Sequence, residues 1–153
     1  MATGLYGEEV HVGDKWTTVG RTITETDVIT FAGMTADYNP LHTDEPWCQE
    51  NSKFKTRIAH GMLVSSIALG LCCRAGFGEG TSIAALGCTW EYIGPVLIGD
   101  TIHVEVEVLE MKQSRSKPEQ GVQVLGYTVL NQRNEVVQKA TFKAMKKWYR
   151  PKD

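Results

Sequence analysis

The sequence predicts an α+β fold in which a curved antiparallel sheet wraps around one long central helix. The segment from Gly61 to Ala75 carries apolar residues around its whole circumference, which is typical of a helix buried on all sides. The last third of the chain consists of strand-like segments at hairpin spacing, and such strands pair antiparallel. One face of this sheet has to be covered, so we expect it to curve around the helix.

The size and composition indicate one domain, which we take as residues 1–153, with a mass of 17.0 kDa. The 16 basic and 18 acidic residues give a net charge of -2, so nothing indicates a nucleic-acid partner. No basic stretch followed by an apolar one is visible at the N-terminus, and the longest uncharged apolar stretch, Gly61 to Cys73, is too short to cross a bilayer. We therefore expect a cytoplasmic protein without a membrane partner.

Three short elements are expected ahead of the central helix. Trp16 to Val19 is a candidate strand. A helix is expected to begin after Thr24, whose side chain can cap it, and Asp27 can complete a capping box three positions later. Pro40 stops any continuation of this helix because its ring removes a backbone donor. The segment from Asp44 to Ser52 is expected to form a second short helix.

The rest of the chain is expected to form the sheet. The clearest pattern is Ile102 to Val108, where apolar and polar residues alternate as in a strand with one buried face. Further strands are expected at Ile83 to Trp90, Val122 to Leu130 and Val136 to Lys146, and a polar hairpin turn at Asn131 to Asn134 joins the last two. One such sheet leaves the central helix partly open, so we expect a second copy to complete the cover in a homodimer.

The four cysteines lack the usual spacing of a zinc site, because no pair forms a CxxC motif. We expect reduced thiols packed as small apolar groups, and we expect neither a metal nor a cofactor. Of the four histidines, His11 lies in a polar segment and His103 alternates outward between valines, so both are expected to face solvent. His42 and His60 remain as candidates for acid–base chemistry near neutral pH.

The first candidate group is the pair Asp37 and His42, which flank the turn at Asn39-Pro40. Because the proline forces a bend after the first helix, the two side chains can face one space. A carboxylate beside an imidazole gives a water molecule two hydrogen-bond partners, and it can orient the ring and raise its basicity. Asp37 could instead satisfy loop amides, since Asp, Asn and Pro are common turn residues, and spacing alone leaves both interpretations open.

The second candidate group is His60-Gly61, directly before the central helix. A helix N-terminus presents unpaired amide donors and a partial positive charge, and glycine permits a ligand to approach the backbone closely. The Gly61 amide could therefore hold a developing oxyanion. Equally, Gly61 could be only a tight start of the helix, and His60 a packed, hydrogen-bonded residue.

Several segments together resemble the MaoC-like hydratases and dehydratases, the (R)-specific enoyl-CoA hydratase group. The segment Phe31 to His42, with its D-x-N-P-x-H run, is the most specific part of the resemblance. Ile58 to Leu63 is similar to the start of the family's central helix, Pro95 to Thr101 to the beginning of the strand after it, and Glu8 to Asp14 to the opening of the domain. The likeness spans most of the chain in matching order.

The resemblance implies a hot-dog fold, in which an antiparallel sheet wraps around a long helix, working as a dimer or a pair of dimers. It also implies a lyase of fatty acid metabolism that acts on an acyl thioester, usually of coenzyme A. Such an enzyme adds water to a 2-enoyl group to give an (R)-3-hydroxyacyl thioester, or removes it. By motif position, Asp37 and His42 match the catalytic pair, and Gly61 matches the residue whose amide binds the thioester oxygen. Asn39 matches a residue that shapes the loop, and His60 joins Gly61 and Asn39 among the expected substrate-binding residues.

Other positions bear on the binding wall. Gly94 stands before Pro95, where many relatives carry a basic or larger residue. Four side chains between His42 and Gly61 could shape the acyl site, contact coenzyme A phosphates or face solvent. These residues are Trp47, Lys53, Lys55 and Arg57. The side chains expected to set the length of the acyl tunnel are Leu69, Trp90 and Met34.

Two alternatives use the same fold. An acyl-CoA thioesterase would direct water to C1 in place of C3, but thioesterases of this fold do not need a histidine where His42 stands. A non-catalytic acyl-CoA-binding subunit would keep the shape and lose the chemistry, since fold alone never implies activity. The intact Asp37 and His42 pair argues against both.

Overall fold

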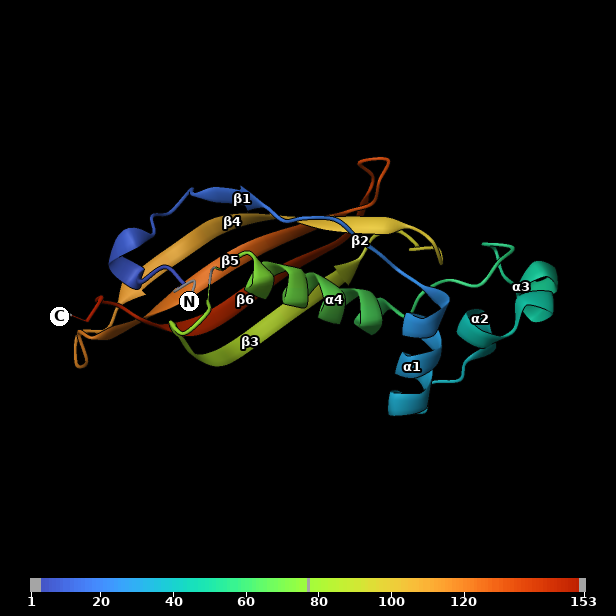
Figure 1. The fold of residues 1–153 in the computed structure, drawn as a ribbon, viewed down its shortest axis with the longest axis horizontal. Helices are drawn as coiled ribbons and strands as arrows, with labels where there is room; N and C mark the ends of the chain where they lie inside the picture. Colours follow the sequence, from blue (N-terminus) through green and yellow to red (C-terminus); the bar gives the residue numbers. More distant parts are fainter. Residues whose placement is uncertain (1–3, 77, 152–153) are drawn as a thin grey trace.

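The computed structural model describes residues 4–76 and 78–151. The expected domain of residues 1–153 therefore includes positions 1–3, 77 and 152–153, which lie outside the described residues. One sheet and helix α4 form the body of the molecule, and the shorter helices α1, α2 and α3 lie together at one end of it (Figure 1).

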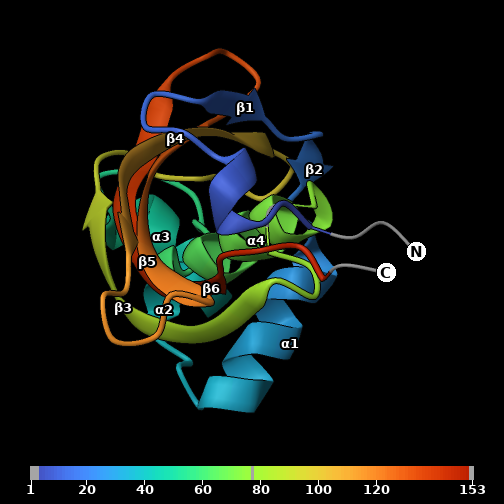
Figure 2. The same cartoon turned by 90° about the vertical axis from the view of Figure 1, so that its left-hand side faces the viewer.

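The sheet is antiparallel throughout, with the strand order β1-β4-β5-β6-β3 and with β2 also paired to β4. Its strands are β1 (Lys15–Thr17), β2 (Arg21–Thr22), β3 (Ser82–Tyr92), β4 (Thr101–Gln113), β5 (Gln120–Leu130) and β6 (Val136–Lys147). The four long strands lie where the sequence predicts them. Figure 2 shows the sheet curving around α4, which confirms the predicted arrangement.

Alternation along β4 sorts its side chains as predicted. Val104, Val106 and Val108 are buried, whereas Glu105 is exposed and His103 is partly exposed. The buried valines belong to one hydrophobic core with the inner face of α4. That face is formed by Leu63, Val64, Ala68, Leu71 and Cys72. Burial of this apolar surface is what holds the sheet and the helix together.

Helix α1 (Glu25–Thr35) begins with the predicted capping box. The Asp27 amide donates to Thr24 Oγ1 at 3.2 Å, and the Thr24 amide donates to Asp27 Oδ2 at 2.8 Å. The helix ends at Ala36, which adopts a left-handed φ of 61°. The helix thus does not continue to Pro40, in agreement with the prediction, and the left-handed residue ends it four positions before the proline.

Pro40 instead begins the short helix α2 (Pro40–Thr43), where its missing amide costs nothing because first-turn amides have no intrahelical partner. Helix α3 (Glu45–Asn51) follows at once, within the predicted segment, and Asp44 caps it. A 3-10 turn, η1 (Gly7–Glu9), lies near the opposite end of the sheet (Figure 1).

Helix α4 (Gly61–Arg74) has the predicted bounds to within one residue, and in the single chain one side of it stays open, as expected. Met62, Ser66, Gly70 and Cys73 are exposed and lie on one side of the helix. The reason is geometric, because one sheet wraps only part of the helix circumference.

The cysteines are all free, and only Cys48 and Cys72 are buried as expected. Cys73 on α4 and Cys88 on β3 are exposed, so the expectation of packed thiols is wrong for these two. Among the described residues, no helix has the length and apolar character needed to cross a membrane.

Candidate active site

The turn between α1 and α2 and the start of α4 bring three candidate side chains together. Asp37 lies in the turn, His42 in α2, and His60 directly before α4. One nitrogen or carboxylate oxygen of each side chain lies within 4.8 Å of the others. The predicted meeting of Asp37 and His42 across the proline bend is therefore present in the fold, while their catalytic roles remain a prediction.

The hydrogen bond of His42 fixes which of its ring nitrogens can act as a base. Nδ1 lies 2.7 Å from the carbonyl oxygen of Ile58, and a carbonyl only accepts, so Nδ1 carries the hydrogen. In the neutral ring, Nε2 then holds a free lone pair. Burial lowers the pKa of His42, and the nearby His60 lowers it further, whereas the Ile58 hydrogen bond and the Asp37 charge oppose this shift. The ring is therefore a neutral proton acceptor near pH 7.

Asn39 shapes the turn that carries the pair, as expected. Its side-chain Oδ1 accepts from the Leu41 amide at 3.0 Å and so caps α2, while its own amide donates to Asp37 Oδ1 at 3.3 Å. The Asn39 side chain thus serves the backbone, and its backbone amide helps to orient the Asp37 carboxylate.

His60 links the turn to the central helix and is the packed, hydrogen-bonded residue of the second interpretation. Its Nε2 donates to the backbone carbonyl of Asp37 at 3.0 Å, and its ring stacks on His42 with a centroid distance of 3.8 Å. The side chain is only 2% exposed, and its Nδ1 has no hydrogen-bond partner among the described residues. His60 therefore holds the backbone of Asp37 by a hydrogen bond and the ring of His42 by stacking.

Gly61 begins α4 without a side-chain cap, because the preceding His60 makes no capping hydrogen bond. The amides of this first turn have no carbonyl one turn earlier in the helix, so they are available to an acceptor. The Tyr92 ring packs against Gly61 so closely that a Cβ atom there would lie 2.8 Å from Tyr92 Cε1. A larger residue at position 61 would therefore have to displace the Tyr92 ring.

These residues open into one cavity of about 670 Å³, a size suited to a small-molecule ligand. Its wall includes all the candidate groups except Asn39, together with apolar and aromatic side chains from five segments. The residues that complete the wall around Asp37, His42, His60 and Gly61 include Phe31, Leu41, Lys53, Phe54, Met62, Tyr92, Gly94, Pro95 and Gln138. Gly94 thus forms part of the wall, as expected.

The three residues expected to set the tunnel length do not line this cavity. Met34 is 74% exposed on the outer side of α1. Leu69 lines a second, smaller cavity of about 320 Å³, beside the C-terminal half of α4, and Trp90 lines neither. The prediction was wrong about Leu69 because eight residues of helix separate it from Gly61, which is a rise of about 12 Å.

The cationic segment before α4 has divided roles. Lys53 and Phe54 line the cavity, and the Lys53 ammonium lies 5.0 Å from the Phe54 ring centroid. Lys55 donates to the carbonyl of Glu50 at 3.3 Å, and Trp47 is exposed away from the cavity wall. Of the three cations, only Lys53 reaches the site.

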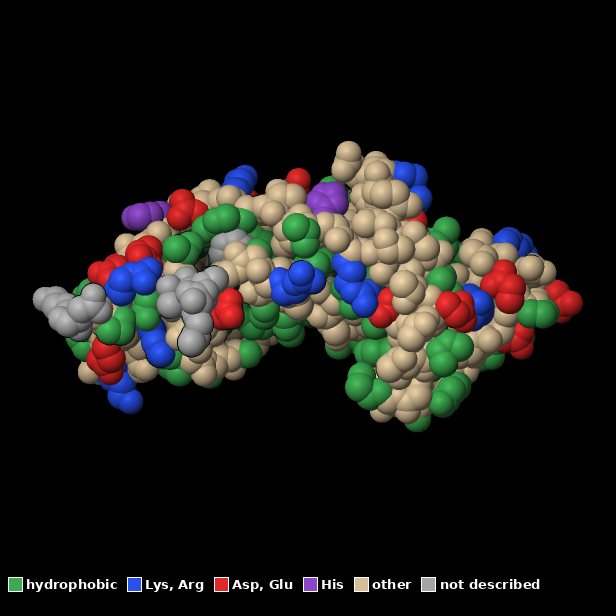
Figure 3. All heavy atoms as spheres, in the orientation of Figure 1, with side chains coloured by type: hydrophobic (Ala, Val, Ile, Leu, Met, Phe, Trp, Pro, Cys, Tyr) green, Lys and Arg blue, Asp and Glu red, His purple; other side chains and the backbone are tan. Residues whose placement is uncertain are grey.

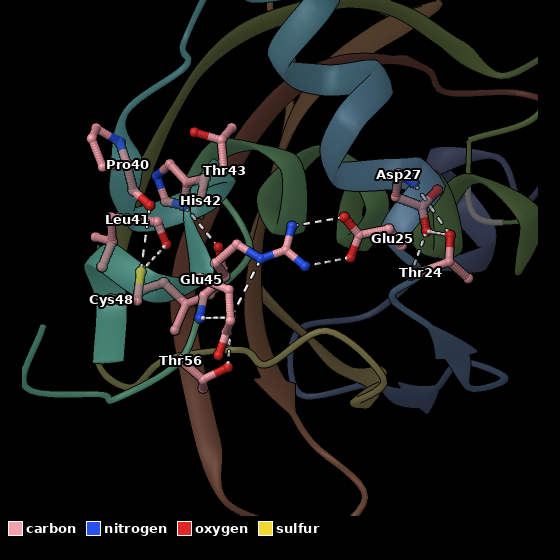
Figure 4. A network of polar contacts seen from close by, with 12 residues as sticks. Thr24, Glu25, Asp27, Pro40, Leu41, His42, Thr43, Glu45, Cys48 and Thr56 are labelled. Atoms are coloured by element: carbon pink, nitrogen blue, oxygen red, sulfur yellow. Dashed lines mark hydrogen bonds and ion pairs between the residues drawn. The ribbon is translucent and has the colours of Figure 1, made fainter. Parts of the chain in front are cut away.

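Arg57 is held by polar contacts with Glu25 and Glu45, two residues labelled in Figure 4. Its guanidinium group donates to both Glu25 carboxylate oxygens, at 2.7 and 2.9 Å, and its backbone amide donates to Glu45 Oε2 at 3.0 Å. Glu25 begins α1 and Glu45 begins α3, and the next residue, Ile58, holds His42. Arg57 therefore ties α1 to α3 beside the segment that carries Asp37 and His42, and it does not line the cavity.

Tyr92 and Gln138 are site residues that the sequence analysis missed. Gln138 carried a usable signal, because it is a polar residue in register with the inward-facing Ala140 and Phe142. Tyr92 carried no such signal, because no sequence pattern around it indicates that the end of β3 reaches Gly61.

The fold is a hot-dog fold, because an antiparallel sheet wraps around a central helix. The cavity at the N-terminus of this helix contains a histidine and a carboxylate, which are side chains suited to proton transfer. The MaoC like domain matches residues 9–129, and this chain belongs to that family.

Individual relatives agree with this assignment. The (R)-specific enoyl-CoA hydratase of Rhodospirillum rubrum is 34% identical over 108 residues, which are 67% of this chain and 69% of that protein. The crystal structure of the MaoC-like dehydratase from Rhodospirillum rubrum is 31% identical with a TM-score of 0.87, over 97% of this chain and 100% of that one. A Mycobacterium tuberculosis protein with a double hotdog fold is 20% identical with a TM-score of 0.85, over 97% of this chain and 47% of that one, and supports the fold alone.

Proposed function

We propose that this protein is an (R)-specific enoyl-CoA hydratase, which runs as a 3-hydroxyacyl thioester dehydratase in the reverse direction. The observation that carries the proposal is the meeting of the His42 ring and the Asp37 carboxylate in a cavity that also contains an uncapped helix N-terminus. The family and the relative named (R)-specific enoyl-CoA hydratase support the same reaction.

The hydration uses two parts of the site. The thioester carbonyl accepts a hydrogen bond from the Gly61 amide, and the positive end of α4 stabilises the enolate charge that develops on the carbonyl oxygen. Water lies between Asp37 and His42, and one of them takes its proton while the oxygen attacks C3. A proton is then delivered to C2 from the same face, so that one water molecule has been added in all.

The free Nε2 lone pair favours His42 as the group that takes the proton. The Ile58 hydrogen bond occupies Nδ1, so Nε2 is the only ring atom that can exchange a proton with substrate. Asp37 carries a negative charge beside the imidazolium that forms, and this charge stabilises it.

Lys53 and Phe54 are the residues that we assign to the coenzyme A end of the substrate. Both lie at the cavity wall, and an ammonium beside an aromatic ring offers a phosphate partner next to a stacking surface. Arg57 is excluded from this role because Glu25 and Glu45 already bind it.

The test is a panel of enoyl-CoA thioesters of graded length and branching, with hydration followed as loss of absorbance from the conjugated thioester. We expect turnover of at least one member and an (R)-3-hydroxyacyl product on chiral analysis. Release of free thiol without loss of the double bond would assign the protein as a thioesterase. Binding of acyl-CoA without turnover of any member would assign it as a non-catalytic subunit.

We also propose that the protein is a homodimer in which two copies pair along β3. This strand lies at the edge of the sheet, and among the described strands it pairs only with β6; all of its residues except Trp90 are exposed. The exposed side of α4 and the second cavity adjoin it, and Figure 3 shows hydrophobic side chains along the margin of a notch in this part of the surface. Pairing of two β3 strands would extend the sheet and cover these apolar groups.

The mass in solution tests this dimer. Leu86 on β3 is 45% exposed, and Leu109 on β4 is 46% exposed but lies away from the β3 edge. We expect Leu86→Lys to give monomers in sedimentation experiments and Leu109→Lys to leave the assembly intact. A monomeric wild-type protein would overturn the proposal.

A further inference from the structure

We propose that Gln138 is a positioning residue of the thioester site, which holds the first peptide of α4 by its carbonyl and leaves the amide donors of that turn open. The inference rests on the proposed function and adds to it a residue on β6, 77 positions from Gly61. It follows from how this helix N-terminus differs from the others.

Three of the four α-helices in the described part of the chain begin with a side-chain cap. The oxygens of Thr24, Asn39 and Asp44 each accept from a first-turn amide of their helix. Only α4 lacks such a bond. A cap would occupy a first-turn amide and compete with a substrate carbonyl for the donors there. An open N-terminus therefore has to be fixed in some other way.

Gln138 supplies that restraint from the carbonyl side. Its side chain is 2% exposed, and Nε2 donates to the Gly61 carbonyl at 2.9 Å. Ser65 Oγ lies 3.0 Å from both the Gly61 carbonyl and Gln138 Oε1, and its single hydrogen serves one of them at a time. Of the two side-chain hydrogen bonds to the Gly61 carbonyl, the one from Gln138 is thus always available, whereas the one from Ser65 is shared. In this buried setting the Gln138 bond is stronger than it would be in water.

The neighbouring strand restrains Gly61 from another direction. Tyr92 on β3 is the cross-strand partner of Gln138 on β6, and the Tyr92 ring packs directly against Gly61. This cross-strand pair therefore contacts the first residue of α4 twice, through the Gln138 amide and through the Tyr92 ring. Glycine is the residue with the most conformational freedom, so this position depends most on such contacts.

The consequence concerns the precision of the oxyanion donors. A displacement of about 1 Å at a reacting group can cost about 100-fold in rate. We therefore expect Gln138→Leu, which removes the amide and keeps a similar volume, to lower kcat by about 10- to 100-fold with KM changed much less. The matched control is Gln123→Leu on β5, because Gln123 is also buried but lines the cavity at the other end of α4.

A second variant separates positioning from a loss of folding. In Gln138→Glu, the new carboxyl group can donate to the Gly61 carbonyl only while it is protonated, and burial beside a carbonyl favours the protonated form. We expect its kcat, relative to wild type and per folded protein, to rise as the pH falls toward 5.5. A merely structural role would give a constant ratio.

Amide order at Gly61 and Met62, measured by ¹⁵N relaxation and hydrogen exchange, decides the inference directly. We expect both amides to lose order and protection in Gln138→Leu and to keep them in Gln123→Leu. Unchanged order in Gln138→Leu, or a kcat within twofold of wild type, would overturn the inference. If wild type hydrates no enoyl-CoA, the proposed function fails, and the amide order still decides whether Gln138 holds the helix terminus.

Discussion

Burial of Lys146 makes the free energy of unfolding depend on pH, by an amount that follows from the pKa of this side chain. The side chain lies on β6 far from the active-site cavity, is 1% exposed, and donates to Thr81 Oγ1 at 3.2 Å. Burial lowers the pKa of Lys146 from 10.5 to about 8, and the charge of Glu9 opposes this shift. Folding therefore favours the neutral amine, and the protonated form carries a cost.

The sign and magnitude follow from the two pKa values. The stabilising contribution of the neutral amine is complete above the unfolded pKa of 10.5 and is lost as the pH falls through about 8. At pH 7 the ammonium lowers the free energy of unfolding by about 3 kcal/mol, and at pH 9.5 by roughly half of that. Wild-type protein should therefore gain stability as the pH rises between these values.

Urea unfolding of wild type and Lys146→Met at a series of pH values, at one protein concentration, measures this effect. We expect the difference in unfolding free energy between the two proteins to change by between about 1 and 2 kcal/mol from pH 7 to pH 9.5, with the variant gaining on wild type at the lower pH. Lys143→Met is the control, because Lys143 lies on the same strand but is exposed. Parallel pH profiles for wild type and Lys146→Met would refute the reasoning.

Two further predictions concern the active site. Arg57→Met removes the ion pairs to Glu25 and Glu45, so we expect the free energy of unfolding in urea to fall by about 1–3 kcal/mol and kcat to fall as well. The control is Arg133→Met, which breaks the ion pairs to Asp100 and Glu135 and should leave kcat unchanged. Since burial lowers the pKa of His42, the acid limb of kcat/KM should lie below pH 6.5, and a limb at or above pH 7 would contradict a neutral His42 as base.

Local patterns in the sequence were sufficient for most of the fold. The capping box of α1 depends on two residues three positions apart, and the alternation in β4 depends on neighbours two positions apart. Such short-range signals are set by backbone geometry alone. The pairing of Asp37 with His42 was accessible for the same reason, because one proline turn separates them.

The remaining features depend on contacts between distant segments. Gln138 and Tyr92 reach Gly61 only because β6 and β3 are adjacent in the sheet and pass the start of α4. Likewise, the apolar circumference of α4 indicates what the helix can bury, but not how much of it one sheet covers. An open side was expected, but periodicity does not tell which residues lie on it, and these include Met62 and Cys73.

The most direct test is the turnover of crotonyl-CoA by purified Asp37→Asn and His42→Ala, with His103→Ala as the control for loss of an imidazole on the outer face of the sheet. General acid–base catalysis is worth about 10²- to 10⁴-fold, so each active-site variant should lose that much of kcat while its circular dichroism and assembly stay those of wild type. His103→Ala should retain full activity. Hydration by either active-site variant at a rate near that of wild type would show that the pair does not carry the chemistry.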